Sequence, residues 1–84
     1  MKLGIENLKW FVENDGNVSI GSFGAVRCAA VANDRDNMIA ALEKRNDESI
    51  EDLLNRLDKA INLALEEGEF IDEINKYIEE QYEH

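Results

Sequence analysis

The second half of the chain contains a long apolar stripe, and this stripe limits the possible folds more than any other feature. Its members recur three or four residues apart, as on one face of a helix: Ile50, Leu53, Leu54, Leu57, Ala60, Ile61 and Ala64. Ser49 followed by Asp52 is a helix-start signature, and Gly68 is a typical stop. Because a helix with one apolar face must cover another apolar surface, the sequence predicts a second layer.

The first residues predict a shorter helix over residues 4–14. Its apolar positions fall at helical spacing: Ile5, Leu8, Phe11 and Val12. The run ends at Asn14, where Asn-Asp-Gly signals a stop and a turn. Trp10 adds a second apolar direction to this helix, and a domain this small has a limited interior. We therefore expect part of its aromatic surface to be buried in a homodimer.

After Asn17 the apolar residues alternate with polar ones, which is the pattern of a strand. Val18 and Ile20 follow this period, and residues 25–32 resume it. The interruption between them is Gly21-Ser22-Phe23-Gly24, whose glycines permit the positive φ of a hairpin connection. Two antiparallel strands joined at this segment are predicted.

Residues 38–45 allow two interpretations. The sequence Met-Ile-Ala-Ala-Leu-Glu-Lys-Arg has high helix propensity, but it is short and lies between two clusters of turn residues. A third strand is the preferred interpretation, and a helix is the alternative.

Beyond Gly68 the pattern predicts a second amphipathic helix. Its apolar arc contains Phe70, Ile71, Ile74, Tyr77, Ile78 and Tyr82. Its acidic arc contains Glu69, Asp72, Glu73, Glu79, Glu80 and Glu83. The expected fold is therefore a single small α+β domain over residues 1–84. It has a short N-terminal helix, a two- to three-stranded antiparallel sheet and two amphipathic C-terminal helices.

The charge of the chain is concentrated in its second half. The net charge is −10, and residues 43–84 hold fourteen acids against five Lys or Arg. Direct nucleic-acid binding and anionic membranes are disfavoured, because both depend on basic side chains. The expected partner is a protein with a basic surface. Candidate partner-binding residues are the acids Glu69, Asp72, Glu73, Glu79, Glu80 and Glu83, with Phe23 as an apolar anchor at a loop tip.

Catalytic and metal chemistry find little support in the sequence. Cys28 is the only cysteine and His84 the only histidine, so a nucleophile within the chain lacks a plausible base. The loop that begins at Asp34 has Ile39 where a calcium loop needs glycine and Arg45 where it needs glutamate. We expect no catalytic residues, no cofactor and no metal.

The expected location is the cytoplasm. The first fifteen residues include Glu6 and Lys9 and lack the apolar run of a signal peptide. No stretch approaches the roughly 18 apolar residues that a membrane span requires.

Three segments of the chain resemble a group of short uncharacterised bacterial proteins that are often met in prophage and plasmid settings. The segments are IGSFGAVRCAAVANDRDNMIAALEKR, ESIEDLLNRLDKAI and EFIDEIN, which together cover about Ser19 to Asn75. The resemblance implies no activity and no catalytic residues. In size and charge the chain is also similar to small acidic inhibitors such as anti-CRISPR and anti-restriction proteins.

Two functional hypotheses follow. The first is a non-enzymatic acidic binding module, an inhibitor that docks on a basic nucleic-acid-binding surface of a partner complex. The alternative is a structural or regulatory homo-oligomer, with an antitoxin-like regulator as a variant, in which the acidic face serves only solubility.

Overall fold

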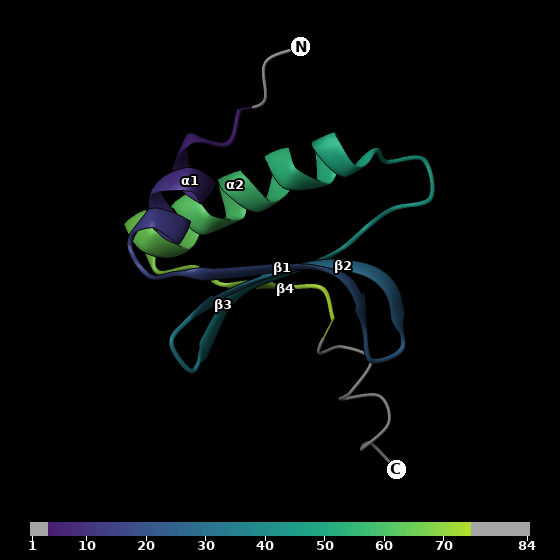
Figure 1. The fold of residues 1–84 in the computed structure, drawn as a ribbon, viewed down its shortest axis with the longest axis horizontal. Coiled ribbons are helices and arrows are strands. Elements are labelled where there is room, and N and C mark those ends of the chain that lie inside the picture. The colour runs from purple at the N-terminus through teal and green to yellow at the C-terminus, as the bar shows by residue number, and fades with distance from the viewer. Residues whose placement is uncertain (1–3, 75–84) are drawn as a thin grey trace.

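The computed structural model describes residues 4–74, which form two layers (Figure 1). A four-stranded sheet forms one layer, and two helices cover one of its faces. The elements in chain order are α1 (Glu6–Glu13), β1 (Asn17–Phe23), β2 (Val26–Asp34), β3 (Asn37–Glu43), α2 (Ile50–Glu67) and β4 (Ile71–Asp72). The expected α+β class is confirmed.

The sheet has the order β1-β2-β3-β4, with β1 to β3 forming an antiparallel meander. The third strand predicted over residues 38–45 is confirmed as β3, and the helical alternative is wrong. Ala40 and Leu42 lie opposite Ala32 and Ala30 of β2 and are buried under the helices. Pairing with β2 and burial thus outweigh the helix propensity of this segment.

The second C-terminal helix is a wrong prediction for the residues that the structure describes. Ile71 and Asp72 form β4, which pairs in parallel with Ala40 and Ala41 of β3. The sheet is therefore mixed and has four strands, where two or three antiparallel strands were expected. The cause is the open edge of β3, whose backbone groups are available to a segment returning from α2. The rest of the predicted helix, residues 75–84, lies outside the described residues.

The main core forms between α2 and the sheet. Leu53, Leu57 and Ile61 of α2 are fully buried. The sheet surface beneath them consists largely of small residues, which lets the helix approach closely: Ala30, Ala32 and Ala40. The stripe predicted from sequence is confirmed at these positions, but Ile50 at the start of α2 is 42% exposed.

A polar strip on α2 holds α1 in place. The Asp58 carboxylate, which is buried, accepts hydrogen bonds from the Leu8 backbone N–H at 2.8 Å and from Asn7 Nδ2 at 3.1 Å. The Asn55 side-chain oxygen accepts from the Gly4 backbone N–H at 3.0 Å. The residue before α1, Ile5, makes no capping side-chain bond. Asp58 therefore satisfies an N-terminal donor of α1 from another helix.

Replacing Asp58 with alanine is expected to lower the free energy of unfolding by about 1–2 kcal/mol, since two donors lose their acceptor. Asp58→Asn is the matched control, because it keeps an oxygen that can accept from the Leu8 N–H and should cost less. Urea unfolding at neutral pH measures both values. Equal stability of the alanine variant and the parent would contradict the capping role.

Candidate protein-binding surface

The helices α1 and α2 run side by side in the same direction. Contacts step forward along both: Gly4 meets Asn55, and Leu8 meets Asp58. Trp10 and Leu65 then line one groove further along. The C-terminal ends of both helices therefore lie at the same end of the molecule (Figure 1).

The groove between the two helices is partly apolar. It has a volume of about 440 Å³ and is lined by Asn7, Trp10, Asn62, Leu65 and Glu66. Trp10 is 55% exposed and Leu65 is 45% exposed, and both side chains line this one groove. In contrast, Phe11 beside Trp10 in sequence is buried in the core. The aromatic surface of α1 is thus divided between the interior and solvent.

Carboxylates gather at the end of this groove, where both helices end, and one of them, Glu66, lines the groove itself. We call Glu13, Asp15, Glu66, Glu67 and Glu69 the acidic pole; all five are exposed. Neither α1 nor α2 has a basic residue in its last turn. The carbonyl ends of the two helix dipoles point to the same end and add to the negative potential there. The surface around Trp10 and Leu65 is therefore apolar at its centre and acidic at its border.

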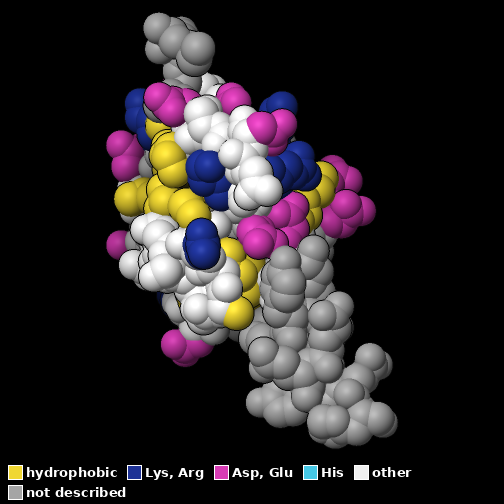
Figure 2. All heavy atoms as spheres, turned by 90° about the vertical axis from the view of Figure 1, so that its right-hand side faces the viewer, with side chains coloured by type: hydrophobic (Ala, Val, Ile, Leu, Met, Phe, Trp, Pro, Cys, Tyr) yellow, Lys and Arg dark blue, Asp and Glu magenta, His cyan; other side chains and the backbone are white. Residues whose placement is uncertain are grey.

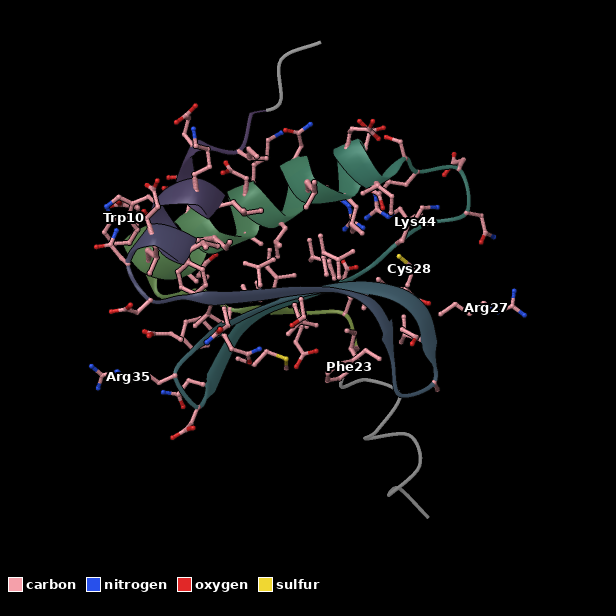
Figure 3. The ribbon with its side chains drawn as sticks, in the orientation of Figure 1. Trp10, Phe23, Arg27, Cys28, Arg35 and Lys44 are labelled. Carbon is pink, nitrogen blue, oxygen red and sulfur yellow. The ribbon has the colours of Figure 1, made fainter. Side chains whose placement is uncertain are left out.

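The cationic residues near the other end of α2 are far from Trp10. Figure 3 places Arg27 and Lys44 at the opposite end of the molecule from Trp10. Figure 2 faces that end and shows Lys and Arg side chains gathered there, with Asp and Glu beside them. That end therefore carries both signs of charge, and Arg35 lies on the same side of the molecule as Trp10 (Figure 3).

Within residues 4–74, the residues predicted to bind a partner do not all lie on one surface. Glu69 is exposed and belongs to the acidic pole, and Asp72 is exposed on β4. Phe23 is 45% exposed, but it lies at the end of β1 and away from Trp10 (Figure 3). Glu79, Glu80 and Glu83 lie outside the described residues.

Glu73 is committed to contacts within the domain. Its Oε2 lies 3.0 Å from Arg56 Nη1, and its Oε1 accepts from the Glu43 backbone N–H at 2.9 Å. Because Ile71 and Asp72 are a strand, Glu69 and Glu73 are not neighbours on one helical face. The continuous acidic stripe expected on a C-terminal helix is therefore absent between these two residues.

Arg56 organises this region. Its Nε lies 2.6 Å from Glu48 Oε2, and its Nη2 donates to the Glu43 carbonyl at 2.9 Å. The hydrogen bond from Arg56 lowers the pKa of Glu48 to about 2, and the bond to Glu48 in turn raises the pKa of Arg56. One guanidinium thus ties together β3, the loop before α2, α2 itself and the segment after β4. We assign this cluster a structural role.

The sequence predicted Trp10 only as part of a homodimer contact, and Leu65 was not predicted as a surface contact residue at all. Each lies beside the buried stripe of its own helix, next to Phe11 and Ala64 respectively. That one-residue offset is the signal in the sequence, because a step of 100° turns a side chain off the buried face.

Comparison with family models, curated proteins and solved structures finds no match to this chain. Within residues 4–74, no three His, Cys, Asp or Glu side chains are grouped so that they could hold a metal ion. Neither helix of that region is both long and apolar enough for a membrane span.

Proposed function

We propose that this chain is a non-enzymatic binding module that docks on a basic surface of a protein partner. The acidic pole and the groove at Trp10 and Leu65 form its contact surface. The observation that carries this proposal is the exposed tryptophan at the acidic ends of two parallel helices. Protein interfaces characteristically combine a central aromatic anchor with a polar border.

Two kinds of contact operate at this surface. Trp10 and Leu65 lose water against apolar or guanidinium groups of the partner, where a tryptophan face also attracts cations. The carboxylates of the acidic pole pair with Lys and Arg at the border and speed the encounter through long-range attraction. A partner surface that binds nucleic-acid phosphates fits this chemistry, because carboxylates compete for the same cations. The module then acts as an inhibitor of that surface.

The electrostatic part is tested by charge reversal at two sites. Pull-down from host lysate at low salt first identifies a partner, whose purified form is then titrated with each variant. Glu66→Lys with Glu67→Lys is expected to weaken binding at least tenfold, with a smaller dependence of affinity on salt. Asp34→Lys with Asp36→Lys is the matched control, since it changes net charge equally on exposed residues at the end of β2 and in the turn that follows it.

The apolar part is tested by Trp10→Ala. Loss of a central aromatic anchor costs roughly 2–3 kcal/mol of binding free energy, or about 30- to 150-fold in affinity. The thermal unfolding midpoint should change little, because Trp10 is more than half exposed. Two results together would show that this surface does not bind the partner. Both charge-reversal pairs would weaken binding equally, and the Trp10→Ala variant would keep full affinity.

A further inference from the structure

The strand β1 forms one edge of the sheet. Among the described residues it pairs with β2 alone, and its outer side carries no strand. The pairing with β2 is regular from Asn17 to Gly21 and becomes irregular between Gly21 and Phe23. Alternate residues of this five-residue segment therefore present backbone donors and acceptors outward, and an edge of this kind is a template for another strand.

Natural proteins usually protect such an edge with charged residues or proline. β1 contains neither: its sequence is Asn-Val-Ser-Ile-Gly-Ser-Phe. It lies within residues 16–26, the longest run in the chain without Asp, Glu, Lys or Arg. Ile20 is also 45% exposed on this strand. A neutral, partly apolar edge in a chain of net charge −10 is therefore a surface at which two copies repel each other little.

We infer that β1 pairs antiparallel with β1 of a second copy, which joins the two sheets across a two-fold axis. A second copy fits better than a strand from a basic partner, because β1 carries no charge with which to select one. Two-fold contacts are self-complementary, and identical neutral strands satisfy that condition. An antiparallel pair needs an axis perpendicular to the sheet, so the helices of both copies lie on the same face of the joined sheet.

The side chains of β1 support this pairing. Val18 packs against the main core under the helices, and Ile20, two residues on, belongs to the same face. With the two-fold axis at Ser19, the centre of residues 17–21, Ile20 of each copy lies opposite Val18 of the other, and these side chains lose water. Aliphatic cross-strand neighbours of this kind stabilise sheets. The exposure of Ile20 in a single copy is then explained by its burial in the pair.

The experiment is sedimentation equilibrium of the full chain over a concentration series reaching about 200 µM, at about 50 mM and about 500 mM NaCl. A reversible dimer that strengthens at the higher salt is expected, because screening reduces repulsion between the acidic copies. Ile20→Lys should lower the association constant at least tenfold, although it makes the net charge less negative. Val12→Lys is the matched control, with 46% exposure on α1, and should retain the dimer.

Amide hydrogen exchange provides a second measurement on the unaltered chain. Exchange in residues 17–21 should slow as protein concentration rises, while exchange in the β2–β3 turn stays constant. A chain that remains monomeric at high salt would overturn the inference. A dimer that survives Ile20→Lys, or that Val12→Lys abolishes, would also overturn it, because another surface would then be responsible.

The dimer through β1 and the docking on a basic partner can be disproved separately. Docking on a basic partner weakens with salt and depends on Trp10. Self-association through β1 strengthens with salt and should be unchanged by Trp10→Ala. The association constant of the Trp10→Ala variant with itself therefore distinguishes the two surfaces.

Discussion

Replacing Gly16 with alanine should destabilise the domain by about 2–4 kcal/mol, although the change adds only one methyl group. A Cβ at this position would lie 2.5 Å from two ring carbons of Phe11 and 2.6 Å from the Phe11 carbonyl oxygen. The ring is buried in the core, and the carbonyl accepts the Gly16 backbone N–H at 2.8 Å. Neither the ring nor the carbonyl group can move away without disturbing the end of α1.

Gly4→Ala is the control for this substitution. A Cβ there would meet only the Asn55 side-chain oxygen at 3.3 Å, and Gly4 is exposed, so we expect a loss below about 1 kcal/mol. Unfolding in urea compares the two variants. Combining Gly16→Ala with Phe11→Leu should recover part of the loss, because the smaller side chain removes the ring contact. If the Gly16→Ala variant is as stable as the Gly4→Ala variant, the Gly16 backbone does not lie this close to Phe11.

Replacing Arg56 with methionine is expected to lower the free energy of unfolding by about 2–3 kcal/mol at neutral pH. The aliphatic part of the side chain remains, but Glu48 and Glu73 lose their shared cation. The Glu48 side chain is only 8% exposed, and removing one partner of a well-shielded pair leaves an uncompensated charge. Lys59→Met removes one positive charge from the exposed side of the same helix and should cost less than about 1 kcal/mol.

The pH dependence of stability gives this prediction a second readout. The pKa of Glu48 is lowered from 4.5 to about 2 in the folded chain, chiefly by the hydrogen bond from Arg56. A lowered carboxyl pKa stabilises the fold above the unfolded value, and this contribution is lost as pH falls from about 4.5 toward 2.

The Arg56→Met variant lacks that contribution at neutral pH, so the stability gap between it and the parent should narrow as pH falls through this range. Urea unfolding at several pH values between 7 and about 2.5 checks this. A gap that stays constant would show that Arg56 acts through packing alone.

Some elements were predictable because their signals are local. The cap at Ser49 is confirmed, since its side-chain oxygen accepts the Asp52 backbone N–H at 3.0 Å. Gly68 ends α2 with φ 70, as a left-handed cap residue does. The turn after α1 was predicted at the right place. Asp15 adopts the positive φ in this turn, and Gly16 is instead the residue that lies close to Phe11.

Other elements depend on partners that local pattern does not contain. Residues 37–43 form a strand because β2 lies beside them, and Ile71 and Asp72 join the sheet because β3 has an open edge. The candidate protein-binding surface also depends on residues that are far apart in the sequence. Glu13 and Glu66 are more than fifty residues apart, and the parallel course of two helices brings their ends together.

The acidity of the chain, the α+β class and the limits of α2 could be predicted from local signals, because composition, caps and a 3.6-residue period act within one segment. Packing between segments determines which aromatic residue of α1 faces solvent, which two glutamates Arg56 holds and which strand is left at the edge. Each of these depends on two segments meeting in space. Helix and strand signals arise from neighbouring residues, whereas strand pairing, burial and ion pairing arise from the packing of distant segments.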